Sequence, residues 1–249
     1  DLANFGVHFD VWFSEQSLHD SGRVDEVIKL LTDKGYTYEK DGALWFKASE
    51  FGAVKDEVLI RANGLPTYFA SDIAYHKDKF DRGFDLVIDI WGADHHGHIA
   101  RMKGALKALG YDPDKLVIII MQLVRLYRNG EIARISKRTG RAVTLADIVE
   151  EVGRDAARFF FNLRSADTHL DFDLDLAVEQ SSQNPVYYVQ YAHARICSIL
   201  RKLAESGVTP RKVTEEELLR LSTPAEIALI RRLSQLPGEI VAVTERYDP

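Results

Sequence analysis

The spacing of hydrophobic and polar residues changes along the chain, and this change predicts two differently built parts. In the first part, strand-like and helix-like patterns alternate. They predict a short strand at Phe9–Phe13, a helix at Val24–Leu31, and a hairpin with strands Tyr36–Tyr38 and Leu44–Phe46 around Lys40-Asp41-Gly42. Mixed patterns of this kind are typical of an α/β domain.

A βαβ unit is predicted in the middle of the chain. Leu86–Trp91 is a largely apolar run, and Ile99, Met102, Leu106 and Leu109 then follow at helical spacing. The next run, Leu116–Ile120, is rich in β-branched residues. Two parallel strands joined by a helix, with both strand faces covered, fit this pattern.

Further along, the pattern becomes helical. Asn129-Gly130 separates two short strand-like runs, Gln122–Tyr127 and Glu131–Ile135, and predicts a second hairpin. Strict alternation predicts one more strand, with one solvated face, at His169–Leu176. Three capping-box starts, at Thr144, Thr214 and Thr223, predict helices beyond about Arg141.

Composition narrows the class of protein. The 249 residues are 46% hydrophobic and carry a formal charge of −6, which excludes a disordered chain and a general polycation. No apolar run reaches the roughly 18 residues that span a bilayer, and no signal peptide opens the chain. With a single cysteine, Cys197, the chain is expected to be soluble and cytoplasmic. Because it lacks an initiator methionine and stops just after a helical stretch, we expect a fragment.

The segment from Trp91 to His98 is the first candidate site. It follows a buried strand and precedes a helix, where open α/β sheets place their ligand crevice. Gly92 allows close backbone approach, Asp94 can accept hydrogen bonds from a ribose, and the imidazoles can stack on a base. A metal site made by Asp94, His96 and His98 is the competing interpretation, and a solvated polar turn is the third.

Two other groups of residues suggest ligands of opposite charge. Tyr68 and Asp72 lie four residues apart, on one face of a helix, and suit a guanidinium; an ordinary surface contact is the alternative. Arg134–Gly140 combines three cations with two hydroxyls and suits a polyphosphate, although a solvated basic turn has the same composition.

Near the end of the chain, Tyr187, Tyr191 and Arg195 recur every fourth residue of a predicted helix. Such a row can stack on unpaired bases or pack against another helix. Cys197 lies among apolar residues of the same helix, which predicts a structural thiol rather than a nucleophile.

Together, these motifs resemble arginyl-tRNA synthetases. The order is Tyr68-x-x-x-Asp72, then Trp91–Gly97, then Gln122–Leu126 leading into Ile135–Gly140. Two later segments, Gly153–Phe159 and Tyr188–Ile196, are similar to the junction and anticodon-binding helices of that family. The resemblance covers nearly the whole chain.

The resemblance implies an α/β fold: the second half of a Rossmann-type class I catalytic domain, followed by a truncated helical anticodon-binding bundle. We expect the catalytic part at residues 1–141, a stem or junction at 142–178 and the anticodon-binding part at 179–249. The His-Ile-Gly-His signature of class I synthetases is absent from the sequence. We therefore expect the first half of the catalytic domain and the C-terminal end to be missing.

The resemblance also assigns roles to residues. It implies that Tyr68 and Asp72 bind arginine and that Gly92, Asp94, His95 and Gln122 bind ATP. It implies that Arg134, Ser136 and Lys137 stabilise pyrophosphate. In a protein of this family, we expect the row of Tyr187, Tyr191 and Arg195 to contact tRNA. The signature loop departs from the family pattern, since Arg134 and Ile135 stand where the family has lysine and methionine.

The implied substrates are L-arginine, ATP with Mg²⁺, and the arginine tRNA, with no metal bound by the protein and no membrane partner. The isolated chain is expected to be inactive. Two other functions remain open from the sequence: a metal-dependent hydrolase using Asp94, His96 and His98, and a non-enzymatic RNA-binding module.

Overall fold

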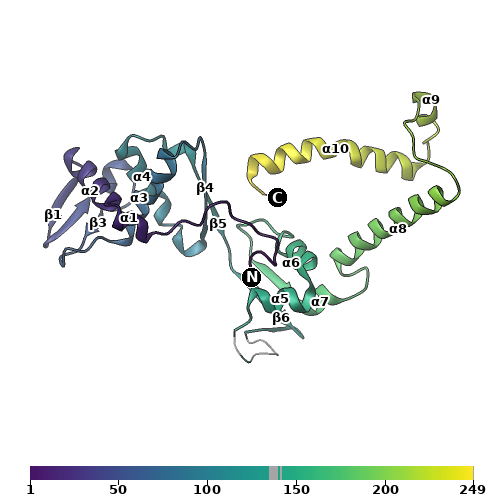
Figure 1. Ribbon diagram of the computed structural model, residues 1–249, viewed down its shortest axis with the longest axis horizontal. Helices are drawn as coiled ribbons and strands as arrows, with labels where there is room; N and C mark the ends of the chain where they lie inside the picture. Colours follow the sequence, from purple (N-terminus) through teal and green to yellow (C-terminus); the bar gives the residue numbers. More distant parts are fainter. Residues whose placement is uncertain (135–139, 141, 249) are drawn as a thin grey trace. The chain divides into compact units, whose positions relative to one another are not determined.

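A computed structural model describes residues 1–134, 140 and 142–248 (Figure 1). The chain divides into two compact units. The first, here called the βαβ unit, comprises His8–Leu123 with Ala166–Thr168. The second, here called the helical unit, comprises Asp1–Val7, Val124–Ser165 and His169–Pro249. The domain limits expected at 141 and 178 stay predictions.

The βαβ unit contains most of the strands and helices expected for its sequence. Its elements are α1 (Gln16–Asp20), α2 (Arg23–Asp33), β1 (Thr37–Lys40), β2 (Ala43–Phe46), η1 (Ala48–Phe51), β3 (Glu57–Ile60), α3 (Tyr68–Asp81), β4 (Val87–Gly92), η2 (Ala93–His95), α4 (His98–Leu109), η3 (Pro113–Lys115) and β5 (Leu116–Met121). The helix at α2 and the β1–β2 hairpin are confirmed. Asp41 and Gly42 form the turn of this hairpin, with positive φ angles of 53° and 73°.

The strand predicted at Phe9–Phe13 is wrong, because the structure has no regular element there. Phe9 and Trp12 are 54% and 77% exposed. A short apolar run becomes a strand only when a neighbouring strand takes up its backbone hydrogen bonds, and no strand pairs with this segment.

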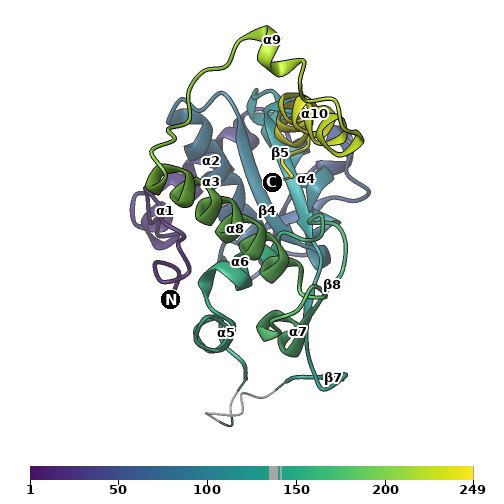
Figure 2. The same ribbon diagram turned by 90° about the vertical axis from the view of Figure 1, so that its right-hand side faces the viewer.

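The predicted βαβ arrangement is confirmed. Strands β4 and β5 are parallel and in continuous register from Val87↔Leu116 to Gly92↔Met121 (Figure 2). One expectation fails, since only one face of β4 is covered. Val87 and Asp89 are buried, whereas Ile88 and Ile90 on the opposite face are 43% and 63% exposed.

Helix α4 lies close to η1. Met102, Ala105 and Leu106 of α4 are fully buried in the core of the unit. A Cβ atom at Gly104 would lie 3.0 Å from Cβ of Phe51 in η1, so the absence of a side chain permits this approach.

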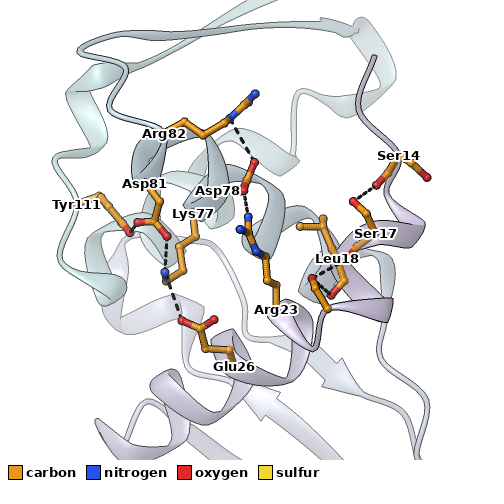
Figure 3. Close-up of polar contacts among 11 residues, drawn as sticks. Ser14, Ser17, Leu18, Arg23, Glu26, Lys77, Asp78, Asp81, Arg82 and Tyr111 are labelled. Atoms are coloured by element: carbon orange, nitrogen blue, oxygen red, sulfur yellow. Dashed lines mark hydrogen bonds and ion pairs between the residues drawn. The ribbon is translucent and has the colours of Figure 1, made fainter. Parts of the chain in front are cut away.

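A polar network joins α2 to α3 (Figure 3). Asp78 pairs with Arg23 and Arg82, and Lys77 pairs with Glu26 at 3.4 Å and with Asp81 at 2.6 Å. The Tyr111 hydroxyl donates to Asp81 at 2.6 Å. Burial and this hydrogen bond raise the pKa of Tyr111 to about 12.

In the helical unit, short strands precede a series of helices. The elements are β6 (Val124–Arg128), β7 (Glu131–Ile132), α5 (Leu145–Val152), α6 (Arg154–Phe161), β8 (Leu170–Asp173), α7 (Leu174–Val178), α8 (Pro185–Glu205), α9 (Glu215–Leu218) and α10 (Pro224–Arg246). The Asn129-Gly130 hairpin is confirmed, as are the capping boxes at Thr144, Thr214 and Thr223.

The strand expected at His169–Leu176 is half right. Its first half is β8, which pairs in parallel with β6 and buries Leu170 and Phe172 on one face. The second half is helical because the Asp173 carboxylate accepts hydrogen bonds from the backbone N–H groups of Asp175 and Leu176. Asp173 is therefore the N-cap of α7.

Helices α8 and α10 are long and largely exposed. In α8 the one buried residue is Val186, and α10 has none within the described chain. Cys197 is exposed, which corrects the expectation of a structural thiol, because Ile196, Ile199 and Leu200 around it are exposed too. None of the described helices combines the length and apolar character that a membrane crossing needs.

Candidate functional site

Helix α3 positions the first pair of candidate residues. The Thr67 hydroxyl donates to the carbonyl of Val58 in β3 at 2.7 Å and caps the helix by accepting from the N–H of Ala70. This double contact fixes where α3 begins relative to β3. Tyr68 and Asp72 then lie one turn apart on the same helix, as the sequence predicts.

Asp72 lines a pocket of about 480 Å³ between α3, β4 and the turn that follows β4. The pocket is lined by Asp72, Tyr75, His76, Lys79, Ile88, Asp89, Ile90, Trp91, His95 and His98. We call it the Asp72 pocket. Of the residues that the sequence suggested, it brings together Asp72, His95 and His98.

The Asp72 carboxylate is the unpaired acidic group of this pocket. No hydrogen bond or ion pair joins it to any other residue in the described part of the chain, and it is half-buried. Burial raises the pKa of Asp72, while the positive charges of His76 and Lys79 oppose that rise. A partly buried carboxylate without a partner is costly, and a bound cation would relieve that cost.

The second carboxylate of the pocket, Asp89, is fully engaged. One oxygen lies 2.5 Å from Nε2 of His76, and the other accepts from Nζ of Lys79 at 2.6 Å. Burial alone would raise the pKa of Asp89, but its hydrogen bonds and ion pairs with His76 and Lys79 hold it below its usual range.

The candidate ATP residues Gly92, Asp94, His95 and Gln122 gather at one edge of the parallel sheet. Because Gly92 pairs with Met121, Gln122 and the turn at Ala93–His95 both follow the carboxyl ends of their strands. A Cβ atom at Gly92 would lie 2.6 Å from Oδ1 of Asp94, so only glycine leaves that carboxylate in place. The Asp94 side chain is 81% exposed and available to a ligand.

Aromatic rings surround the same turn. The rings of Trp91 and His98 meet edge to face at 6.4 Å, and those of His95 and His98 at 5.3 Å. Burial, with the charges of Arg101 and His95, lowers the pKa of His98. Within the described residues no three His, Cys, Asp or Glu side chains converge as metal ligands, so the geometry gives the Asp94, His96 and His98 hydrolase no support.

Tyr68 faces a different pocket from Asp72. Its side chain is 77% exposed and lines a hollow of about 520 Å³ with Tyr38, Trp45 and Arg61. The Arg61 guanidinium lies 6.0 Å from the Tyr68 ring centre. The two residues predicted to hold one guanidinium thus share a helix but not a pocket in this structure.

The remaining candidates belong to the helical unit. Arg134 is exposed, whereas Ser136 and Lys137 lie outside the described residues. On α8, Arg195 donates to the Tyr191 hydroxyl at 3.3 Å, so these two are in contact. Tyr187 is half-buried and lines a hollow with Arg154 at the start of α6. The tRNA-binding role of all three stays a prediction.

Sequence reasoning missed His76, Lys79 and Asp89. One signal was available: Asp89 is an acid inside a largely apolar strand, and a buried carboxylate needs a partner. His76 and Lys79 also lie four and seven residues after Asp72, on the same helical face. The sequence does not indicate that His76 and Lys79 on α3 pair with Asp89 on β4.

Two family models match the chain. Residues 4–197 match the class I tRNA synthetases (R), catalytic domain, and residues 189–249 match the DALR anticodon binding domain.

Proteins named arginine–tRNA ligase are similar over nearly the whole chain. That of Carboxydothermus hydrogenoformans is 65% identical over 96% of this chain, and that of Heliobacterium modesticaldum is 62% identical over all of it. The chain spans only 43% and 45% of these relatives. The fold matches Thermus thermophilus arginyl-tRNA synthetase with a TM-score of 0.82 at 22% identity, over all of this chain and 50% of that one.

Proposed function

The chain belongs to the class I arginyl-tRNA synthetases, and on that premise we propose that the protein containing it joins L-arginine to its tRNA. The arginine carboxylate attacks the α-phosphate of ATP, forming arginyl-adenylate and releasing pyrophosphate. A hydroxyl of the terminal ribose of the tRNA then attacks the arginyl carbonyl, forming the ester and releasing AMP. The neighbours of Asp72 and the sheet edge beside it support this assignment.

The assignment of arginine as the substrate rests on one observation: the Asp72 carboxylate has no partner among the described residues. We propose that it accepts charge-assisted hydrogen bonds from the arginine guanidinium, a group that presents planar donors to a carboxylate. Tyr68, one turn earlier on α3, is also proposed to contact the arginine side chain, although in this structure it lines a different pocket.

ATP is proposed to bind at the carboxyl edge of β4 and β5. There Asp94 accepts from the ribose hydroxyls, Gly92 lets the nucleotide approach the backbone, and His95 and Gln122 border the site. Arg134, Ser136 and Lys137 are proposed to stabilise the pyrophosphate. Mg²⁺ is proposed to bind with the ATP phosphates.

The chemistry depends on positioning and charge stabilisation, with no protein nucleophile. Within the chain, Asp72 holds the side chain of the amino acid and the turn at Gly92–His95 holds the nucleotide. The DALR match begins at residue 189 and supports the proposal that Tyr191 and Arg195 contact tRNA. Tyr187 lies just before the match and is proposed to join them from its place on the same helix. We also propose that these 249 residues alone do not turn over, which an exchange assay on the isolated chain tests directly.

The deciding experiment is arginine-dependent ATP–pyrophosphate exchange in the protein containing this chain. For Asp72→Asn, loss of a charge-assisted hydrogen bond is expected to raise the KM for arginine by about tenfold to a hundredfold. The matched control is Asp25→Asn, an exposed acid of α2, which should leave KM unchanged. An unchanged arginine KM in Asp72→Asn would remove Asp72 from the site.

Lys137→Ala tests the phosphate end of the reaction. Because one charge-stabilising contact is lost in the transition state, kcat for exchange is expected to fall more than about tenfold with arginine affinity intact. Equal activity would exclude Lys137 from the mechanism.

A further inference from the structure

A buried ionic cluster lies beside Asp72, in the wall of the same pocket. It consists of His76 and Lys79 on α3 and Asp89 on β4, with side chains 4%, 15% and 7% exposed. The Lys79 ammonium also lies 4.4 Å from the ring centre of Tyr75. The catalytic scheme above gives this cluster no role.

The hydrogen bonds of His76 fix the direction of each contact. Its Nδ1 lies 2.7 Å from the backbone carbonyl of Asp72, which can only accept, so Nδ1 carries a hydrogen. Its Nε2 faces the Asp89 carboxylate at 2.5 Å, and this contact needs one shared proton. With Lys79 on the other oxygen, both Asp89 oxygens are occupied and the cluster carries one net positive charge.

Asp72 presents the opposite situation. Its carboxylate is bonded to none of the described residues, although it borders the same pocket. We propose that His76, Lys79 and Asp89 are positioning residues for arginine binding. Their positive cluster keeps the Asp72 carboxylate ionised and closes off Asp89, so that Asp72 is the acceptor that a guanidinium meets. This inference rests on the proposed function.

The charges around Asp72 give the sign of the effect. Burial has the largest effect on the pKa of Asp72 and raises it. Glu15 and Asp89 also raise this pKa, whereas His76 and Lys79 lower it. Tyr75, His95 and His98 are the other titratable groups of the pocket. Asp72 must be ionised to pair with a cation, so arginine binding is lost as pH falls through its pKa. Removing a cation of the cluster moves that loss to higher pH.

The experiment measures arginine affinity against pH in the protein containing this chain. Arginine affinity is expected to fall at low pH, and we call this part of the pH profile the acid limb. Asp72→Asn identifies the acid limb that belongs to Asp72, because that limb disappears in the variant. Lys79→Met and His76→Gln are each expected to move the limb to higher pH and to lower affinity on the limb by at least about threefold. Above the limb, kcat for pyrophosphate exchange changes little.

Three variants separate this role from structural support. Lys77→Met, on the same helix, removes an ammonium that pairs with Glu26 and Asp81 and should not move the limb. Lys79→Arg keeps the charge and should keep the limb in place. Asp89→Asn breaks the same hydrogen bonds but removes an anion, so the limb stays or moves to lower pH.

The outcomes of these experiments test the inference as follows. An unmoved limb in both Lys79→Met and His76→Gln overturns the inference, and so does an upward shift in all three cluster variants, which would indicate general loosening. If either Lys79→Met or His76→Gln fails to fold, the other remains decisive, and if both fail, Asp89→Asn decides by the direction of its shift. Absence of arginine-dependent exchange in the unmodified protein would instead overturn the proposed function.

Discussion

Helices α3 and α10 both have apolar residues at helical spacing, but they differ in how far those residues are buried. In α3, Phe69, Ala70, Ile73 and Ala74 are buried against the core of the βαβ unit. In α10, Ile227, Ile230, Leu233 and Leu236 recur at helical spacing but are 42–60% exposed. The signals that define its start are local: the Thr223 capping box and Pro224 in the first turn.

The difference matters for function. A packed helix holds its side chains in fixed positions, which the Asp72 pocket requires. A helix defined by its own caps positions side chains only relative to itself. This contrast leads to four predictions, for which the chain provides convenient probes: Trp12, Trp45 and Trp91 all lie in the βαβ unit.

The largest expected effect comes from the core. Phe46 is fully buried, so Phe46→Ala should lower the free energy of unfolding of the βαβ unit by about 3–5 kcal/mol. Urea unfolding followed by tryptophan fluorescence measures it. Leu233→Ala in α10, where the side chain is 60% exposed, should change stability by less than about 0.5 kcal/mol. Similar losses in the two variants would contradict the contrast.

A second pair of variants places the same substitution in both regions. Gly104→Ala puts a methyl group 3.0 Å from Phe51, and the strain should outweigh the gain in helix propensity, costing about 1–2 kcal/mol. Gly238→Ala in α10 meets no atom within 4 Å and should instead increase helicity. Unfolding curves measure the first change and circular dichroism the second. A stabilising Gly104→Ala would show that η1 can move aside.

The third prediction concerns the local signals of α10. Thr223→Ala removes a cap that accepts from the N–H of Glu226, which should cost about 1 kcal/mol of helix stability and lower the helical signal in circular dichroism. Ser234→Ala is the control, since that hydroxyl bonds a carbonyl of its own helix. If helicity survives in Thr223→Ala, contacts other than the cap hold α10.

The smallest effect is a gain in stability at the proposed arginine site. Because burial raises the pKa of Asp72, the ionised carboxylate destabilises the folded state, and this penalty grows as pH rises through the folded pKa. Asp72→Asn should therefore raise stability at neutral pH by less than about 1 kcal/mol, since solvent still reaches the group. At low pH the two proteins should converge. Destabilisation at neutral pH would show that Asp72 has a structural partner.

The sequence predicts elements well where local chemistry decides them. Asn129-Gly130 and the capping threonines act within a few residues, and all formed as expected. Predictions failed where the outcome depended on distant partners. Phe9–Phe13 found no neighbouring strand, and Asp173 turned the end of a predicted strand into a helix cap.

The candidate site divides in the same way. Asp72, Asp94 and His95 were found from motifs that each lie within one segment. The cluster of His76, Lys79 and Asp89 was not, because it joins two elements whose approach depends on how α3 packs on β4. A charged residue in a buried strand indicates that a partner exists, but not which residue it is.

The hydrogen bond from His76 to the Asp72 carbonyl has an evolutionary consequence. Each residue of an α-helix turns the chain by about 100°, so one residue inserted or deleted between Asp72 and Lys79 would swing the cluster away from the carboxylate it serves. The length of this stretch is therefore fixed by the cluster. We expect relatives that keep this cluster to tolerate no insertions or deletions across these two turns of α3.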